Sequence, residues 1–187
     1  MVDFIHQVDN SWTLFLDRDG VINRRIFGGY VTKTADFEFL PDVLPSLNIF
    51  ARRFGRICVV TNQQGVGKGL MSENQVNTLH QFMIEQVRQS GGRIDKVYYC
   101  PDLATEPNNC RKPNIHMANL AKADFPEINF SKSIMVGDSL SDLEFGRNAG
   151  MHVIYVKHDP EIKKNPFEGS ISGLSELADW LLQDRKY

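Results

Sequence analysis

The sequence is poor in cysteine, in long hydrophobic runs and in excess positive charge. Its three cysteines, Cys58, Cys100 and Cys110, lie among 187 residues. So small and odd a number is untypical of a disulfide framework, and we expect free thiols in a reducing, cytoplasmic compartment. The net charge of −2 supplies no broad basic field, so we expect neither nucleic acid nor a membrane as a partner. No apolar run approaches the length of a membrane span, and the stretch MVDFIHQVDNSW lacks the pattern of a secretory signal.

What the chain does have is the composition of an ordinary globular domain. Hydrophobic residues make up 42% of the sequence and charged residues 24%. A chain of this length can bury a sizeable core. We therefore predict a single domain over residues 1–187, and we expect a monomer.

Short β-rich runs alternate with helical patterns along the chain. The predicted strands are Trp12–Leu16, Arg56–Thr61, Ile94–Tyr99, Ser133–Gly137 and His152–Val156. The predicted helices are Asp42–Arg53, Ser72–Ser90, Ile115–Ala123, Leu140–Asn148 and Leu174–Gln183. Several strands are continuous apolar runs, which is typical of strands covered on both faces. The alternation predicts a three-layer α/β fold, a Rossmann-like parallel sheet with helices on both faces.

Polar residues follow several of the predicted strands at the point where each strand ends. The stretch LFLDRDGVIN, residues 14–23, runs from apolar residues directly into Asp17 and Asp19. Thr61 and Asn62 close the second strand, and Asp138 follows the fourth. Because ligands of parallel α/β sheets bind at the carboxyl ends of the strands, we expect these side chains to converge on one site.

The two carboxylates of the first stretch have a chemical use that would justify placing like charges together. Phosphoryl transfer needs a nucleophile in line with phosphorus, cations on the equatorial oxygens and a proton for the leaving group. Asp17 fits the nucleophile, forming an aspartyl-phosphate, and Asp19 fits the general acid and base. Acids that face a phosphate dianion require a divalent cation, and hard oxygen ligands select Mg²⁺. Thr61 and Lys112 fit the groups that stabilise phosphoryl oxygens.

Taken singly, each of these motifs also has a purely structural explanation. Asp-x-Asp-Gly is often a turn, and Thr-Asn after a strand is ordinary turn chemistry. Asp138 could cap the following helix, and Lys112 could be a solvated surface lysine. The motifs occur in a fixed order, however, and three of the four end strands. This conjunction favours the functional interpretation.

In these motifs the chain resembles the haloacid dehalogenase-like phosphohydrolases. LFLDRDGVIN looks like the first family motif, VVTN the second, RKP the third and VGDSLSD the fourth. Within the family, the chain is most similar to the group of D-glycero-D-manno-heptose 1,7-bisphosphate 7-phosphatases and histidinol-phosphatases, through DRDGVIN, GGYV, FEFLPDV, VVTNQQGVGKG, YYCPD, CRKP and VGDSLSD. The resemblance implies a Mg²⁺-dependent phosphatase that removes the 7-phosphate of this heptose bisphosphate; the alternative is a histidinol-phosphatase or a broad sugar-phosphate phosphatase. Because the Arg24–Leu40 insert is long enough only for a short flap, we expect a minimal cap.

The resemblance also implies roles for individual residues. Asp17 would be the nucleophile and Asp19 the acid and base. Asp17, the backbone carbonyl of Asp19 and Asp138 would hold Mg²⁺. Thr61 and Lys112 would stabilise the transferred phosphoryl group. The remaining expectations are that Asp142 orients Lys112 or a water, that Arg111 recognises a second phosphate, and that further contacts to the phosphorylated sugar come from Arg25, Tyr30, Asn62, Gln63 and Gln64.

The chain departs from this group at two places. Relatives commonly bind zinc through a Cys-x-His … Cys-x-Cys loop, whereas the corresponding stretch here, CPDLATEPNNC, keeps only Cys100 and Cys110. Structural zinc wants four good ligands, so we expect at most weak zinc binding by these two residues. Many heptose-bisphosphate enzymes also have lysine after the fourth-motif aspartate. Ser139 stands there instead, and the cation near one phosphate is missing.

Two further features invite other interpretations. A phospho-accepting, receiver-like signalling domain also combines Asp, Thr and Lys at the edge of a parallel sheet, but its phosphorylated Asp follows the third strand. Here Asp-x-Asp-Gly follows the first predicted strand. His80 lies on or beside the apolar stripe of a predicted helix, and we expect it to pack or to face solvent. The GVGKG stretch at 65–69 lacks the full spacing of a P-loop, so we interpret it as a substrate loop in which Lys68 is a possible contact.

Overall fold

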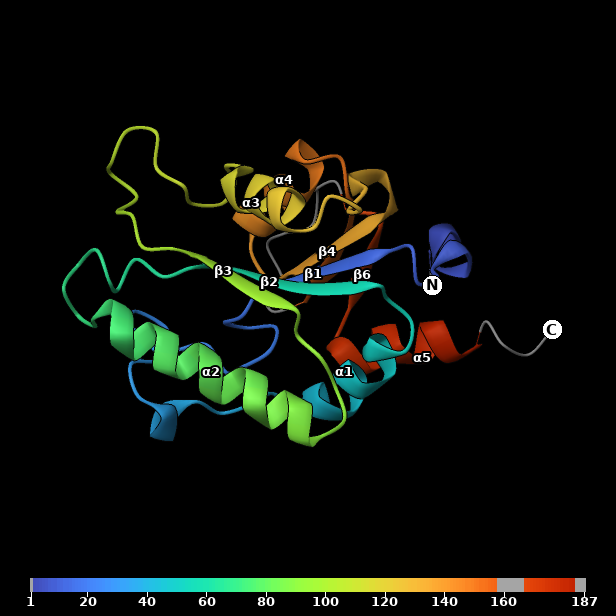
Figure 1. The fold of residues 1–187 in the computed structure, drawn as a ribbon, viewed down its shortest axis with the longest axis horizontal. Helices are drawn as coiled ribbons and strands as arrows, with labels where there is room; N and C mark the ends of the chain where they lie inside the picture. The colour runs from blue at the N-terminus through green and yellow to red at the C-terminus, as the bar shows by residue number, and fades with distance from the viewer. Residues whose placement is uncertain (1, 158–166, 184–187) are drawn as a thin grey trace.

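The computed structural model describes residues 2–157 and 167–183, which contain a six-stranded parallel sheet. Its strands are β1 (Thr13–Leu16), β2 (Arg56–Asn62), β3 (Lys96–Cys100), β4 (Ser133–Gly137), β5 (His152–Val156) and β6 (Gly169–Ile171). They lie in the order β3-β2-β1-β4-β5-β6, with β1 in the interior (Figure 1). The order reverses direction beside β1, which is where ligands bind in open α/β sheets.

Helices cover both faces of this sheet, as Figure 1 shows. One layer contains α1 (Val43–Ala51), α2 (Glu73–Gln89) and α5 (Leu174–Gln183), and the other contains α3 (His116–Asp124) and α4 (Leu140–Asn148). Short 3₁₀-helices span Asp3–Gln7, Thr34–Asp36 and Phe130–Lys132. The predicted three-layer α/β fold is confirmed.

The core residues of the central strands alternate between the two layers. In β1, Leu14 and Leu16 belong to the cluster that packs against α1, α2 and α5, while Phe15 belongs to the cluster beneath α3 and α4. Every residue of β1 and of β4 is buried. Leu16 is in register with Val59 of β2 and with Val136 of β4. The residues that follow these strands are therefore held side by side on rigid supports.

The predicted helices and strands agree with the structure to within a few residues at their ends. The Ser72–Gln75 capping box is present at the start of α2: each side chain bonds the other residue's backbone N–H. The sequence analysis missed β6, because the three residues GSI are too short to show a period. The 24–40 insert contains one 3₁₀-turn and no larger element, which agrees with a minimal cap.

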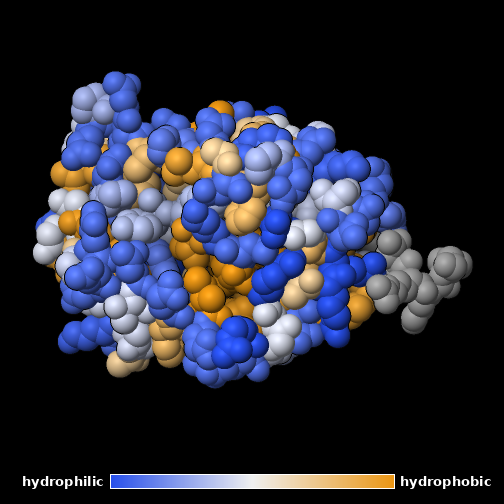
Figure 2. All heavy atoms as spheres, in the orientation of Figure 1, coloured by the Kyte–Doolittle hydropathy of each residue, from blue (hydrophilic) through white to orange (hydrophobic). Residues whose placement is uncertain are grey.

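Hydrophilic and hydrophobic residues are unevenly distributed over the face of the molecule drawn in Figure 2. Hydrophilic residues dominate the face in Figure 2, with hydrophobic residues gathered near the centre of that view. Among the described residues, no helix has both the length and the apolar character needed to cross a bilayer. The most exposed large hydrophobic side chains include Phe27 in the flap and Leu70 in the loop before α2.

Candidate active site

Two buried carboxylates lie at the carboxyl edge of the sheet, one after β1 and one after β4. Asp17 donates its backbone N–H to Val136 O of β4, which ties the end of β1 to its neighbour (3.0 Å). Asp138 reaches the same place because Gly20 has no side chain. A Cβ atom on Gly20 would lie 2.1 Å from Asp138 Oδ2, and the φ of Gly20 is +95°. Only glycine readily combines this conformation with so close an approach.

Lys112 brings a positive charge into this group of acids. Its Nζ atom lies 2.6 Å from Asp17 Oδ1, 2.6 Å from Asp142 Oδ1 and 2.7 Å from Val60 O. The side chain is almost fully buried. An ammonium group has three hydrogens, so each has an acceptor here. The predicted site lysine is thus an internal ion-pair partner and not a solvated surface residue.

Asp142 connects Lys112 to the first turn of α4. While its Oδ1 atom pairs with Lys112, its Oδ2 atom accepts from Ser139 N at 3.0 Å and from Ser139 Oγ at 2.6 Å. Gly137 makes room for this arrangement, since a Cβ atom there would lie 2.1 Å from Asp142 Cβ. Asp142 therefore caps α4 and orients Lys112 with the same carboxylate.

The carboxylate of Asp19 is not part of this group of acids and is held by three side chains. Arg18 Nη2 donates to both oxygens of Asp19, at 3.0 and 2.9 Å. Asn23 Nδ2 and Gln63 Nε2 donate to one oxygen each, at 2.9 and 2.8 Å. Gln63 Nε2 also contacts Thr61 Oγ1 at 2.9 Å, so Thr61 lies within the same network.

The surroundings of these groups shift their pKa values in different directions. Burial raises the pKa of Asp17 to about 8, because the opposing charge of Lys112 is offset by the carboxylates of Asp142, Asp138 and Asp19. Burial alone would also raise the pKa of Asp19, but the Arg18 charge and the hydrogen bonds from Asn23, Arg18 and Gln63 hold it below its ordinary value. Burial works to lower the pKa of Lys112, and the two carboxylates beside it outweigh burial and raise it.

The donor set at this edge fits a hard divalent cation. Asp17, Asp138 and Asp142 each offer a carboxylate oxygen, and these atoms lie within 4.8 Å of one another. Carboxylate oxygens without soft ligands suit Mg²⁺. Burial is the main cause of the raised pKa of Asp17, and the neighbouring carboxylates add to it; a cation would offset the latter contribution.

A cavity of about 430 Å³ opens above the carboxylates and extends toward the flap. The flap contributes Arg25 and Tyr30, and the loop after β2 contributes Gln64 and Lys68. Arg111 lines it from the loop before α3. Five of the predicted substrate contacts, Arg25, Tyr30, Asn62, Gln64 and Arg111, thus line one cavity, and so does the possible contact Lys68. The lining also includes Asp17, Asp19, Thr61, Lys112, Asp138 and Asp142.

Two predicted substrate residues have other partners. Gln63 is buried and is not among the described residues that line the cavity; its amide holds Asp19 and Thr61. Asn62 lines the cavity, but its side chain accepts from Lys112 N at 2.9 Å and donates to Lys112 O at 3.3 Å. These contacts make Gln63 a support for Asp19, and they tie Asn62 to the Lys112 loop while it lines the cavity.

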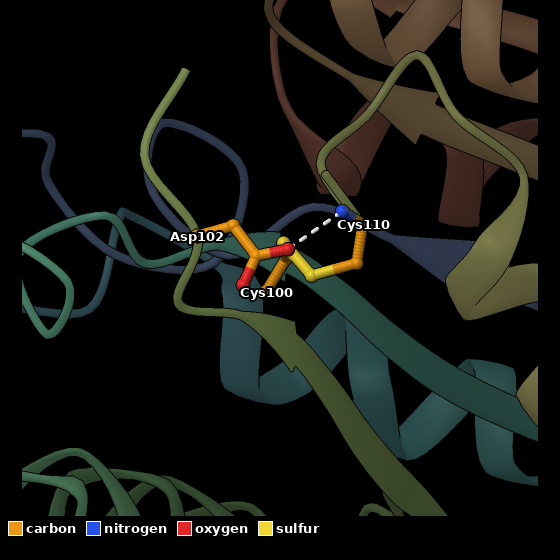
Figure 3. A group of neighbouring side chains, drawn as sticks. All are labelled: Cys100, Asp102 and Cys110. Atoms are coloured by element: carbon orange, nitrogen blue, oxygen red, sulfur yellow. Dashed lines mark hydrogen bonds between the residues drawn. A yellow bond between two sulfur atoms is a disulfide. The ribbon is translucent and has the colours of Figure 1, made fainter. Parts of the chain in front are cut away.

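The expectation of free thiols at Cys100 and Cys110 is wrong for this structure. The two residues form a disulfide that joins the end of β3 to the loop of Arg111 and Lys112 (Figure 3). Asp102 Oδ2 accepts a hydrogen bond from Cys110 N at 2.8 Å. The sequence analysis counted cysteines over the whole chain, and the odd residue is Cys58, which is buried and free. Sulfurs joined in a disulfide are not the thiolates that ligate zinc.

Sequence analysis also missed Arg18 and His80 as members of the site. Arg18 is fully buried, and its Nη1 atom lies 3.2 Å from Nε2 of the buried His80. The expectation that His80 packs or faces solvent accounted for its burial but not for this polar contact. One signal was present in DRDG: a basic residue between two acids at a buried strand end can be accommodated only if it pairs with one of them.

Together, the fold and the cluster of carboxylates around a buried lysine define a phosphoric monoester hydrolase. Residues 109–166 match the HAD-hydrolase-like family. A D-glycero-alpha-D-manno-heptose-1,7-bisphosphate 7-phosphatase from Mycobacterium tuberculosis is 42% identical over 139 residues, 74% of this chain and 73% of the relative. The enzyme of that name from Campylobacter jejuni is 35% identical, over 89% of this chain and 94% of the relative. The chain belongs to the haloacid dehalogenase-like hydrolases.

Solved structures agree with this assignment. The D,D-heptose 1,7-bisphosphate phosphatase of B. bronchiseptica, complexed with magnesium and phosphate, superposes with a TM-score of 0.84 at 26% identity, covering 92% of this chain and 99% of that one. The corresponding enzyme of Burkholderia thailandensis gives a TM-score of 0.67 at 28% identity, over 91% and 98%. The receiver-like alternative has no support, since β3 ends in Cys100 and not in an aspartate.

Proposed function

We propose that this phosphatase removes the 7-phosphate of D-glycero-D-manno-heptose 1,7-bisphosphate through an aspartyl-phosphate. The single observation that carries the chemistry is the position of Lys112 between Asp17 and Asp142, which sets a fixed cation beside the first carboxylate of the DRDG motif. The relatives named for this substrate, which span most of the chain, support the choice of sugar. We also propose that residues 1–187 form one domain.

In the first step, an Asp17 carboxylate oxygen attacks phosphorus. The bond from phosphorus to the sugar oxygen breaks with its electron pair, and a proton from Asp19 converts the leaving oxygen into a hydroxyl. Lys112 and Thr61 stabilise the charge on the phosphoryl oxygens. Asp19 must hold a proton at this moment. The approaching phosphate dianion favours that, because a nearby like charge raises the pKa of a carboxyl group.

In the second step, water attacks the phosphorus of the aspartyl-phosphate. Asp19 takes a proton from this water, the bond from phosphorus to the Asp17 oxygen breaks, and inorganic phosphate leaves with Asp17 restored as a carboxylate. The contacts of Arg18, Asn23 and Gln63 hold Asp19 ionised in the resting site. That state suits the base of this step.

Mg²⁺ fits the acidic end of the cavity, where Asp17, Asp138 and the backbone carbonyl of Asp19 would hold it. When bound, it would neutralise the crowded carboxylates and polarise phosphoryl oxygens. Asp142 belongs to the same group of acids. Its two oxygens already contact Lys112 and Ser139, so we assign it the orientation of Lys112.

The basic side chains that line the cavity suit the second phosphate of a bisphosphate. Arg111 and Lys68 line the cavity with positive charge, and Lys68 lies over the Tyr30 ring at 5.6 Å. Arg25, also in the lining, is 3.4 Å from Asp138. We propose that these cations take the place of the lysine that is missing at Ser139. We propose no zinc at Cys100 and Cys110. The monomeric state and the cytoplasmic location stay predictions, and the disulfide weighs against the latter.

A substrate panel tests this proposal. With Mg²⁺ present, we expect kcat/KM for the heptose bisphosphate, offered as each anomer, to exceed that for histidinol phosphate and for the heptose 1-phosphate product by at least tenfold. An Arg111→Gln variant should raise KM for the bisphosphate and leave KM for sugar monophosphates nearly unchanged. If histidinol phosphate is the best substrate, the heptose assignment is wrong, and the alternative of a histidinol-phosphatase stands.

A further inference from the structure

Arg18 is an unusual residue to find at the end of a central strand. In the sequence it lies between Asp17 and Asp19, and it is fully buried. Burying a guanidinium is costly unless its charge is paired and its hydrogens are accepted. Arg18 is not among the described residues that line the cavity. It therefore does not touch substrate, and its role must be exerted through its neighbours.

The contacts of Arg18 connect the Asp19 carboxylate with helix α2. On one side, Nη2 donates to both oxygens of Asp19 at 3.0 and 2.9 Å. On the other, Nη1 lies 3.2 Å from His80 Nε2, a contact between residues that are 62 positions apart. Arginine can only donate, so this His80 nitrogen must be the acceptor and carry no proton.

The surroundings of His80 favour its neutral form. Burial, together with the charge of Arg18, lowers the pKa of His80 to about 3. Its ring sits on the stripe of α2 that also buries Val76 and Met83. The ring also packs against that of Tyr99 of β3, with centroids 5.5 Å apart. A helix and a strand thus fix the acceptor that holds the Arg18 guanidinium.

We infer that Arg18, braced by His80, is a positioning residue that fixes the carboxylate of Asp19 for proton transfer to the leaving group. A carboxylate on a turn has several rotamers, and proton transfer needs the one that reaches the leaving oxygen. Asn23 and Gln63 restrict Asp19 by one hydrogen bond each, whereas Arg18 binds both of its oxygens. Arg18 therefore restrains the rotation of the carboxylate more than either amide does. The inference rests on the acid role of Asp19 in the proposed function.

The test compares two phosphate esters whose leaving groups need a proton to different extents. Phenyl phosphate depends strongly on protonation of its leaving oxygen, and p-nitrophenyl phosphate depends on it little. In Arg18→Lys and His80→Leu we expect kcat/KM to fall about tenfold or more for phenyl phosphate, and only about twofold for p-nitrophenyl phosphate. Asp19→Asn should show the same inequality to a larger degree and serves as the reference.

Two further variants separate positioning from packing. His80→Gln keeps an acceptor that can reach Arg18, so it should restore most of the phenyl phosphate activity that His80→Leu loses. Gln81→Ala changes an exposed residue of α2 and should leave both substrates unaffected. Melting temperatures of all variants show whether each is folded at the assay temperature.

Three outcomes would overturn the inference. Equal losses for the two esters in Arg18→Lys would mean that the residue serves packing alone. Unchanged kcat/KM for phenyl phosphate in folded His80→Leu would remove His80 from the network. Failure of His80→Gln to restore activity lost in folded His80→Leu would mean that the hydrogen bond is irrelevant. These assays use aryl phosphates, so they remain informative if the heptose assignment fails.

Discussion

The Asp138 carboxylate lies so close to the Gly20 backbone that it occupies the space a side chain on Gly20 would need. A Cβ atom on Gly20 would fall 2.1 Å from Asp138 Oδ2 and 2.6 Å from its Cγ. The position of the acid that follows β4 is thus set by a missing side chain after β1. The close approach holds two motifs together that are more than a hundred residues apart in the chain.

Substituting Gly20 by alanine should therefore damage the site as well as the backbone. We expect Gly20→Ala to displace Asp138, to lower kcat at least a hundredfold and to reduce the stabilisation of the protein by Mg²⁺. Gly28→Ala is the matched control, because Gly28 also has a positive φ, +70°, but a Cβ atom there meets nothing within 4 Å. Each variant should lose about 1–3 kcal/mol from backbone strain. Comparable activity in the two variants would refute the argument.

Asp17→Asn should abolish turnover without unfolding the protein. Asparagine has nearly the same shape and cannot form the acyl-phosphate, so kcat should fall below detection. The melting temperature without Mg²⁺ should be unchanged or higher, because the substitution removes one of several crowded acids. Asp36→Asn in the exposed 3₁₀-turn of the flap is the control and should keep full activity. Measurable turnover by Asp17→Asn would exclude Asp17 as the nucleophile.

Lys112→Met should destabilise the protein and stop catalysis. It leaves Asp17 and Asp142 buried without their common cation, and breaking a buried ion pair costs about 3–5 kcal/mol. Urea unfolding at neutral pH measures this cost. The double variant Lys112→Met/Asp142→Asn removes one of the stranded acids. It should therefore be more stable than the sum of the two single changes predicts; strict additivity would show that the contact carries no energy.

Stabilisation by Mg²⁺ should grow with pH. The folded-state pKa of Asp17 is raised to about 8 from its ordinary 3.8. A group shifted upward stabilises the fold fully below the unfolded-state pKa, and this contribution is lost as pH rises through the folded-state value. Without metal, the contribution of Asp17 should thus fall between about pH 4 and pH 8. Mg²⁺ offsets the charge responsible for that loss.

We therefore expect Mg²⁺ to raise the melting temperature more at pH 8.5 than at pH 6. Matched buffers without the metal provide the baseline at each pH. In Asp17→Asn, the difference between the two pH values should shrink, because the titrating group is gone. An equal Mg²⁺ response at both pH values in the unsubstituted protein would contradict the assignment.

The cysteines can be counted directly. Protein purified without reductant and then denatured should offer one reactive thiol, Cys58, because Cys100 and Cys110 are paired. Prior reduction should raise the count to three. Three thiols without reduction would remove the disulfide and restore the possibility of weak zinc binding. Metal analysis of the same preparation would then decide that question.

The fold was predictable because its strands are buried on both faces, so their apolar runs stand out against helical periodicity. The convergence of Asp17, Thr61 and Asp138 followed from topology alone, since parallel strands end at one edge. The partners of Asp19 did not follow from the sequence. Whether Gln63 faces substrate or Thr61 depends on a single side-chain rotation that no periodic pattern records.

Contacts between residues that are distant in the sequence could not be predicted, for a similar reason. The pairing of Arg18 with His80 depends on how α2 crosses the sheet, and the sequence specifies that α2 is amphipathic but not its angle. The disulfide was missed because an odd total of cysteines hides a pair when the third is buried in the core. β6 is too short to give a recognisable sequence pattern, and only its pairing with β5 identifies it as a strand.

The saturated ammonium group of Lys112 implies an exchange when substrate arrives. All three of its hydrogens are engaged in the resting site, so a phosphoryl oxygen can reach this nitrogen only by displacing an acceptor. Val60 O belongs to a rigid strand, and Asp142 is anchored to its helix, which leaves the Asp17 contact as the one to yield. The incoming anion would then take the place of Asp17 Oδ1 at the Lys112 nitrogen. The cation that later stabilises the phosphoryl group is thus held, before substrate binds, by the carboxylate that will attack that group.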